Sequence, residues 1–256
     1  MSALDLVPRP GRAPYGRMIL AHARFELGQL LGNGEQLLLT LVIPTVLLIL
    51  LTEVDVVDLG PGPRVRFLLP GVLALAVMST AFTSLAIATG FERRYGVLKR
   101  LGATPLPRAG LMAGKGASAL ACEVLQVVLL VGVALVLGWR PVGAASWAAA
   151  TGLLLLGTAA FAGLGLLMAG TLRAEATLAA ANLVYLLLLL AGGIVVPVSR
   201  FPSGARGTLG WLPSTALADG LRAAFAGAAV PARCVVVLLV WGLVSGLAAA
   251  RWFRWE

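Results

Sequence analysis

Six long apolar stretches, separated by short segments rich in charged residues, glycine and proline, dominate the pattern of the chain. A helix needs about 20 mainly apolar residues, and at least about 17, to cross the hydrocarbon core of a bilayer. Each stretch meets this requirement, so the pattern predicts an all-α polytopic membrane protein with six transmembrane helices. The predicted spans are residues 36–52, 67–90, 113–138, 142–170, 177–198 and 232–253.

A segment of alternating polarity precedes the first span. In residues 15–31, apolar positions such as Ile19 and Ala23 recur at helical spacing, and charged residues stand between them. This spacing predicts an N-terminal amphipathic helix that lies at the membrane interface. Residues 1–15 are expected to form a flexible basic tail, and residues 16–256 a single transmembrane domain.

The composition agrees with a membrane protein. Of the 256 residues, 59% are hydrophobic and 12% are charged, whereas about 25% of a typical soluble domain is charged. The net charge of +9 could indicate a nucleic-acid partner, but the Lys and Arg residues are scattered between the apolar stretches and form no stripe. We therefore expect membrane lipid, and not nucleic acid, to face these cations. The single His22 and the isolated Cys122 and Cys234 exclude a metal cluster or a disulfide framework within the chain.

The distribution of Lys and Arg predicts the orientation. If the N-terminus faces the cytoplasm, the inner segments hold thirteen of the 20 cations and the outer segments seven. Six of the inner cations lie between Arg93 and Lys115. Because inner segments of membrane proteins are enriched in Lys and Arg, the N-terminus is predicted to be cytoplasmic. With an even number of spans, the C-terminus is then cytoplasmic too.

The segment between the second and third spans, residues 91–112, is informative beyond its charge. A short amphipathic helix is predicted from Glu92 to Gly102, with glycine at its end as in a left-handed helix cap. Pro105 and Pro107 then stiffen the return to the membrane. Such a rigid, charged hairpin on the cytoplasmic side is suited to docking on another protein.

This segment resembles the coupling element of ABC-2 type permeases, the membrane subunits of a family of bacterial ABC exporters. The resemblance lies in an acidic-basic start, a glycine, a Lys-Arg-Leu block, and a Thr-Pro-Leu step followed by a basic residue and Gly-Lys. It implies that the segment contacts an ATPase. The residues implied in ATPase coupling are Glu92, Arg93, Arg94, Gly96, Lys99, Arg100, Leu101, Gly102, Thr104 and Pro105.

A second segment, residues 191–228, resembles the outer segment of the same family. It has a Gly-Gly exit from the fifth span, two prolines, an aromatic-Leu-Pro step and a short helix with an Asp-Gly-Leu-Arg core. A short re-entrant or interfacial helical segment is therefore expected outside the membrane between the last two spans. The alternative is an ordinary outer loop with an interfacial helix. The residues that carry the resemblance include Pro197, Pro202, Trp211, Pro213, Asp219 and Arg222.

The resemblance implies the permease subunit of an ABC exporter in the bacterial inner membrane, moving a drug, an antibiotic or a lipid-like amphiphile. Its partners would be a second permease subunit, as a homodimer or heterodimer, and two copies of a separate ABC ATPase. The chain has no complete P-loop, because Gly114-Lys115-Gly116 lacks the following Ser or Thr and the glycine five residues before Gly114. We therefore expect no catalytic residue and no cofactor in this chain, and ATP and magnesium on the partner ATPase.

Three polar side chains within the spans are candidates for the substrate pathway. Glu123 is a carboxylate near the middle of the third span, where a charge is costly and is often functional. Gln126 lies three residues further on the same helix face, and Asn182 lies in the fifth span. Each can equally be a packing residue whose polar group is hydrogen-bonded or, for Glu123, protonated.

Three other functions are compatible with parts of the pattern. One is the export of lipid-linked polysaccharide, although the spans contain few aromatic residues that could stack on sugars. A non-transporting assembly or sensor subunit is another, and it would leave the coupling-like segment without a role. An intramembrane enzyme is the third, but no paired acidic residues occur within the spans, and His22 precedes the first span.

Overall fold

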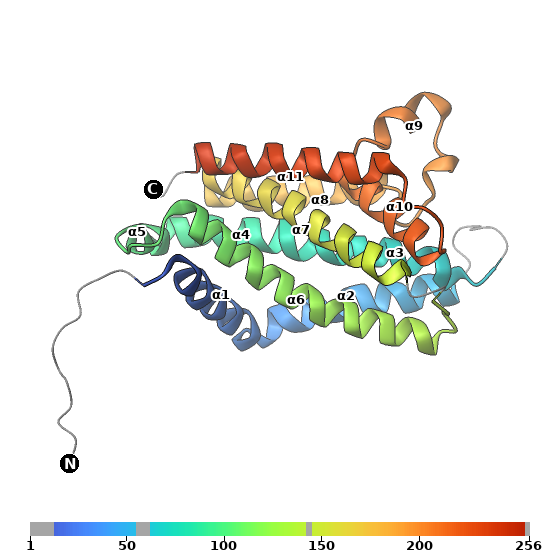
Figure 1. The fold of residues 1–256 in the computed structure, drawn as a ribbon, viewed down its shortest axis with the longest axis horizontal. Coiled ribbons are helices and arrows are strands. Elements are labelled where there is room, and N and C mark those ends of the chain that lie inside the picture. The colour runs from blue at the N-terminus through green and yellow to red at the C-terminus, as the bar shows by residue number, and fades with distance from the viewer. Residues whose placement is uncertain (1–12, 55–61, 142–144, 254–256) are drawn as a thin grey trace, which may run out of the picture.

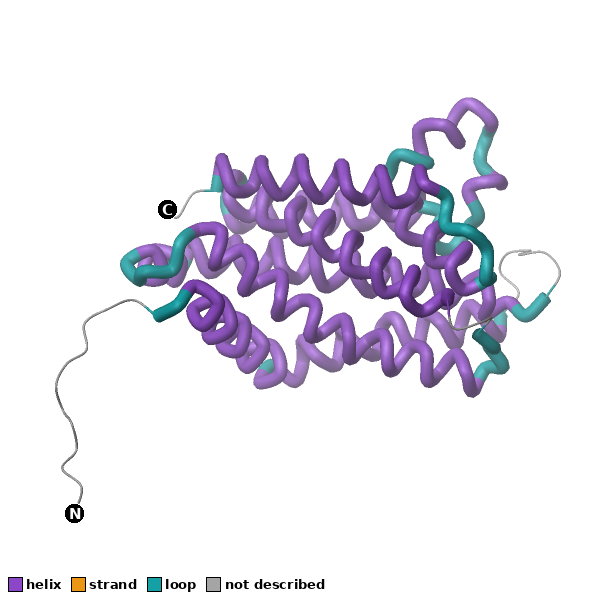
Figure 2. The backbone as a smooth tube through the Cα atoms, in the orientation of Figure 1, coloured by secondary structure: helices purple, strands orange, loops and turns teal. Residues whose placement is uncertain are grey.

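The structure, a computed structural model, describes residues 13–54, 62–141 and 145–253. Within these ranges the chain consists of helices and loops and contains no strand (Figure 2). Most of the predicted basic tail, residues 1–12, lies outside the described residues. The elements are α1 (Tyr15–Gly32), α2 (Gly34–Glu53), α3 (Arg64–Val77), the π-helix η1 (Met78–Ser84), α4 (Leu85–Arg94), α5 (Val97–Gly102), α6 (Arg108–Val136), α7 (Ala145–Thr171), α8 (Ala174–Ala191), the 3-10 helix η2 (Val198–Arg200), α9 (Ser203–Leu209), α10 (Pro213–Phe225) and α11 (Ala232–Trp252).

The helices agree with the predicted membrane spans. Among the described residues, five helical stretches are long and apolar enough to cross a membrane. The first predicted span corresponds to α2, whose apolar part, Thr40–Glu53, is shorter than these five. A helix is present at each of the six predicted spans, and the all-α polytopic membrane fold is confirmed. The five long stretches are Arg64–Arg94, which joins α3, η1 and α4, and Ala109–Val136, Trp147–Thr171, Ala174–Ala191 and Ala232–Trp252.

The fifth predicted span is shorter than expected. It was predicted to continue to residue 198, but α8 ends at Ala191. Gly192 and Gly193 follow directly, and Gly193 has a φ of +66°, in the left-handed region that ends many helices. The apolar residues after Gly193 therefore form a turn, although their hydrophobicity alone would suit a continued helix.

The predicted single helix from Glu92 to Gly102 is wrong, because the structure divides it in two. Glu92 belongs to the last turn of α4, which ends the long helical stretch Arg64–Arg94, and α5 begins only at Val97. Gly96 stands between them with a φ of +72°, a conformation that favours glycine. The left-handed glycine is therefore at the start of α5, and Gly102, which was expected to cap the helix this way, is its last residue without a positive φ.

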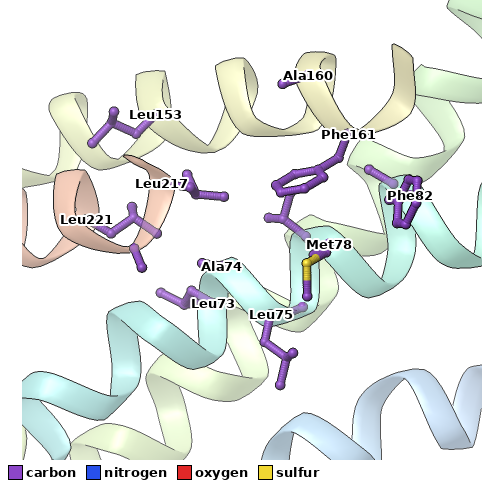
Figure 3. Close-up of a cluster of buried hydrophobic side chains, with 14 of the residues drawn as sticks. Leu73, Ala74, Leu75, Met78, Phe82, Leu153, Ala160, Phe161, Leu217 and Leu221 are labelled. Carbon is purple, nitrogen blue, oxygen red and sulfur yellow. The ribbon is translucent and has the colours of Figure 1, made fainter. Parts of the chain in front are cut away.

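The helix α7 forms the centre of the bundle. It packs most extensively against α11 and also contacts α10, α4 and η1. Gly163 on α7 permits the close approach of α11, since a Cβ atom there would clash with Ser245 Oγ and lie 2.9 Å from the backbone nitrogen of Gly246. Figure 3 shows the buried apolar cluster that joins α3, η1, α7 and α10, in which the ring centroids of Phe82 and Phe161 lie 6.5 Å apart.

The two ends of the bundle differ. Figure 1 shows the start of α1, the short α5 and the end of α11 at one end, and α9 and α10 near the other. We refer to these as the α5 end and the α9 end. At the α5 end, α1 packs against α6 and leaves Leu20 and Phe25 exposed, as suits an interfacial helix that faces lipid.

Candidate functional site

A short hairpin at the α5 end contains the residues predicted to couple to an ATPase. On α5, Leu98 is completely buried and Leu101 packs against the core, so the helix is anchored by its apolar face. Lys99 and Arg100 are exposed on α5. The hairpin therefore presents two cations at the end of the bundle.

Local contacts hold the return from α5 to α6. The Thr104 hydroxyl donates to the Leu101 carbonyl at 2.6 Å and accepts a hydrogen bond from the Leu106 N–H at 3.4 Å. Leu106 is buried, and Pro107 has an extended backbone directly before the first residue of α6. Because the prolines at 105 and 107 fix two backbone dihedrals, the return has little conformational freedom.

The two arginines at the end of α4 bind the connection between α7 and α8. Arg93 donates to the carbonyl of Leu172, and Arg94 forms an ion pair with Glu175. These contacts lie within the chain and tie α4 to the start of α8. A role of Arg93 and Arg94 in ATPase coupling stays a prediction.

A buried ion cluster joins three helices beside this hairpin. The Lys115 side chain on α6 has no exposed surface, and its Nζ lies 2.7 Å from Glu26 Oε1 on α1 and 2.7 Å from Glu92 Oε2 on α4. We call Lys115, Glu26, Glu92 and the adjacent His22 the Lys115 cluster. A buried ammonium is costly to desolvate, and only close opposite charges offset that cost. The cluster therefore holds α1, α4 and α6 together.

His22 extends the cluster along α1. Its Nε2 lies 3.4 Å from Glu26 Oε1, one helical turn away, and its ring lies beside Gly114 on α6. Burial lowers the pKa of His22 below its ordinary value, and Lys115 lowers it further, while Glu26 acts in the opposite direction. His22 is therefore neutral at neutral pH.

A polar cleft of about 160 Å³ opens next to the Lys115 cluster, between α1, η1–α4 and α6. Apolar residues, among them Leu85 and Ala119, form the rest of its wall. Its polar lining consists of Glu26 and Gln29 from α1, Asn33 directly after α1, Thr80, Ser84 and Glu92 from η1–α4, and Ser118 from α6.

Two of the predicted pathway residues lie deeper on α6, and both are buried. Gln126 accepts a hydrogen bond from the Thr80 hydroxyl at 3.1 Å and donates to the Thr40 carbonyl at 3.0 Å. Glu123 accepts a hydrogen bond from the Thr158 hydroxyl on α7. The structure thus brings Glu123 and Gln126 onto the interior side of α6, each with partners inside the chain.

Asn182 is not part of this group. It lies on the exposed face of α8, and its side-chain amide donates to the Leu178 carbonyl of the same helix at 3.0 Å. Exposed leucines, including Leu183 and Leu186, surround it on the helix. If Glu123, Gln126 and Asn182 belong to one pathway, that pathway must also pass the exposed face of α8, where Asn182 lies.

The predicted outer segment folds at the α9 end, and each of its three prolines begins a helix. Pro197 precedes η2, Pro202 precedes α9, and Pro213 is in the first turn of α10. A missing backbone N–H is tolerated at these positions, because it has no partner within the helix. Trp211, before α10, accepts a hydrogen bond at its carbonyl from Trp241 Nε1 on α11, at 2.9 Å.

Arg222 fixes α10 to the rest of the bundle. Its guanidinium donates to Asp219 Oδ1 at 2.8 Å and to the carbonyls of Gly193 and Ile194 at 2.7 and 2.9 Å. It also stacks 3.8 Å from the centroid of the Phe67 ring. Burial lowers the pKa of Arg222, and Asp219 counteracts this shift. Asp219 and Arg222, which were both singled out in the sequence, therefore form an ion pair, and Arg222 also stabilises the turn after α8.

The sequence of this chain matches a known protein family. The family model for the ABC-2 type transporter matches residues 18–226, from α1 past the end of α10. The chain belongs to the ABC-2 type transporter family. A comparison with curated proteins gives no match. As an ABC-2 permease, this protein is the transmembrane transport component of an ABC transporter and a multi-pass membrane protein.

Sequence reasoning did not single out the Lys115 cluster or the polar cleft of this ABC-2 permease. In the sequence, Glu26 is one of the charged positions of the predicted amphipathic helix, and Lys115 is one of the cations of the predicted cytoplasmic side. A signal was present, because Glu26 lies four residues after His22 and three after Ala23, within the buried stripe of α1. Which carboxylate would reach Lys115, however, depends on how α1 packs on α6.

Proposed function

We propose that this ABC-2 permease is an exporter subunit that moves a hydrophobic or amphiphilic molecule out of the cytoplasm or the inner leaflet. ATP, with magnesium, is hydrolysed by a separate ATPase, present in two copies beside two permease subunits. The observation that carries the proposal is the stiff hairpin from α4 through α5 to α6, with its buried anchor Leu98 and its exposed cations.

The α5 end is the cytoplasmic end in this proposal. It contains the cation-rich segment from Arg93 to Lys115, and cytoplasmic segments are enriched in Lys and Arg. The start of α1 and the end of α11 lie at the same end of the bundle (Figure 1), so both termini are assigned to the cytoplasm of a bacterial cell. The α9 end, with α9 and α10, then faces outwards.

The hairpin can convert a push from the ATPase into motion of the spans. An ATPase that docks on Lys99 and Arg100 would move α5, and α5 follows α4 after a two-residue turn. Glu92 in the last turn of α4 holds Lys115 on α6, which in turn holds Glu26 on α1. Motion of α5 would therefore reach three helices at once. Glu92 acts in this proposal through the Lys115 cluster.

The test is co-purification with the ATPase and ATP-dependent transport. Reversing the two α5 cations, by Lys99→Glu with Arg100→Glu, is expected to reduce co-purification sharply, because losing one partner of a buried interfacial charge pair costs about 2–5 kcal/mol. Arg140→Glu, at an exposed residue of the α6–α7 connection, is the matched control. Retained assembly and transport in the α5 variant would refute the docking surface, and a native membrane without any ATPase partner would refute the exporter.

A further inference from the structure

We propose that the polar cleft beside the Lys115 cluster binds the ammonium head group of a cationic amphiphile, and that such amphiphiles are the transported class. This inference rests on the proposed exporter function and adds the chemistry of its substrate. The cleft lies at the α5 end, between the interfacial helix α1 and the spans that contain Glu92 and Ser118. A molecule dissolved in the inner leaflet would meet the cleft from the side.

Each of the three helices contributes one face to the cleft. On η1 and α4, Thr80, Ser84, Ala88 and Glu92 follow each other at intervals of four residues. Side chains at this spacing lie on one side of a helix. The first two of these residues lie in the π-helix η1, Met78–Ser84, a form that often occurs at functional sites. This stripe, polar except at Ala88, leads from the α5 end towards the bundle interior.

The charges of the cleft favour a cation. Two carboxylates, Glu26 and Glu92, line it, and its lining includes no Lys, Arg or His among the described residues. Lys115 lies behind them as the single ammonium that both carboxylates share. The side chains of both carboxylates are partly exposed, 12% for Glu26 and 18% for Glu92. An added ammonium group can therefore contact carboxylate oxygens in the cleft, whereas an anionic group would be repelled.

The size of the cleft decides how much of a ligand it can hold. Pockets that enclose a whole drug-sized ligand have about 300–1,000 Å³, and the volume here is about 160 Å³. The cleft therefore accommodates a head group and leaves the apolar part outside. Exposed apolar residues lie nearby in the chain on α1 and α2, including Leu31 and Leu38, and can contact an alkyl or ring system.

The inner end of the cleft connects to the buried polar residues of α6. Thr80 lines the cleft and donates to Gln126. Gln126 in turn reaches the backbone of α2 at Thr40. A head group that leaves Glu26 and Glu92 would therefore meet hydroxyl and amide groups next. Gln126 thus lies further along the path of the head group and does not contact the substrate at the α5 end.

The experiment uses the purified full-length protein in phosphatidylcholine nanodiscs. The probe is a dodecylamine with a photoreactive diazirine, and its N-acetylated form is the uncharged control probe. Cross-linked peptides are mapped by mass spectrometry. We expect saturable labelling on the cleft faces of α1, η1–α4 and α6 by the amine alone, competed by dodecylamine and not by dodecyl sulfate.

Two variants test the site itself. Ala88→Leu fills the cleft from an exposed position, and Ala250→Leu makes the same change at an exposed position of α11. Glu26→Gln removes one charge with little change in shape. Glu26→Gln is expected to weaken labelling about tenfold or more, the loss expected for one hydrogen bond to a charged group. Ala88→Leu is expected to weaken labelling because the larger side chain occupies the cleft, and Ala250→Leu is expected to have no effect.

The outcomes separate this inference from the exporter proposal. Equal labelling by both probes, labelling elsewhere on the chain, or full labelling of the folded Ala88→Leu protein would overturn the cleft assignment. Coupled transport that persists in such a case would leave the exporter function standing. Saturable amine labelling in the cleft, together with failure to recover any ATPase, would support the cleft and overturn the exporter.

Discussion

Lys115 on α6 and Glu92 on α4 form an ion pair of 2.7 Å, although the Lys115 side chain has no contact with solvent. The two residues are 23 positions apart, on either side of the hairpin that contains α5. The ion pair thus closes the base of the hairpin. Any force on α5 acts on a loop whose two ends are joined by a buried charge pair.

Removal of the ammonium is expected to destabilise the protein strongly. Lys115→Met leaves Glu26 and Glu92 buried side by side without a counterion, a change that typically costs about 3–5 kcal/mol. Thermal unfolding of the purified protein in detergent measures the loss. Arg100→Met, at an exposed arginine of α5, is the control and should be nearly neutral. Equal melting temperatures for the two variants would contradict a structural role of the cluster.

The stability of the protein should fall in mild acid through His22. The folded state lowers the pKa of His22, chiefly by burial. Above the ordinary value of about 6.5 the imidazole is neutral in both states, and below it the unfolded chain binds a proton that the folded chain resists. Stability is therefore lost as the pH falls from about 6.5 towards the lower folded pKa.

The measurement is thermal unfolding between about pH 7.5 and about pH 5.5. His22→Gln keeps a neutral polar side chain that does not titrate, so its curve should be flatter than that of the unchanged protein. Glu26 and Lys115 face His22 in both proteins, and their contribution largely cancels in the difference. Parallel curves would show that His22 does not contribute.

Gly96 should be sensitive to any side chain. Its φ of +72° is left-handed, and an alanine there costs about 1–2 kcal/mol. Gly96→Ala is expected to shift the turn between α4 and α5. We expect a marked loss of ATP-driven transport and only a small decrease in the melting temperature. Gly116→Ala, at a helical glycine whose added Cβ would meet no atom within 4 Å, is the control. Full coupling in Gly96→Ala would remove this turn from the coupling mechanism.

Glu123 is expected to act mainly in packing. Because Thr158 donates to its carboxyl group between α6 and α7, Thr158→Val leaves a buried polar group without a partner, at a cost of about 1–3 kcal/mol. Glu123→Gln keeps an acceptor and should affect stability less. Transport assays on the folded Glu123→Gln protein test the alternative, a role in the substrate pathway. A changed dependence of transport on substrate concentration, with an unchanged melting temperature, would place Glu123 on that pathway.

The orientation can be tested by single-cysteine labelling. Cys122 and Cys234 are both buried and are replaced first. A cysteine at Tyr95, which is exposed at the α5 end, should react with an impermeant reagent only after the cells are opened. A cysteine at Thr208 on α9 should react in intact cells. Reaction of the Tyr95 position from outside would reverse the topology and with it the place of the ATPase.

Hydrophobic pattern alone determined the all-α fold and the approximate position of every long helix. This works because backbone polar groups in a bilayer need hydrogen bonds within the protein, and an unbroken apolar run of about 20 residues satisfies them within itself as a helix. The prolines of the outer segment likewise indicated helix starts and turns, because a residue without a backbone N–H is tolerated mainly at such positions.

Tertiary structure decided what the polar residues do. Glu92, which the resemblance implies in ATPase coupling, pairs with Lys115 within the chain, and Glu26, one of the charged positions of the amphipathic α1, pairs with the same ammonium and is largely buried. The charge of a residue is a local property, but its partner depends on which helix faces pack together, and that is set by small contacts such as Gly114 against His22. The break at Gly96 is of the same kind, since glycine permits both a helical and a left-handed backbone, and the choice depends on tertiary packing, in which the neighbouring Leu98 is completely buried.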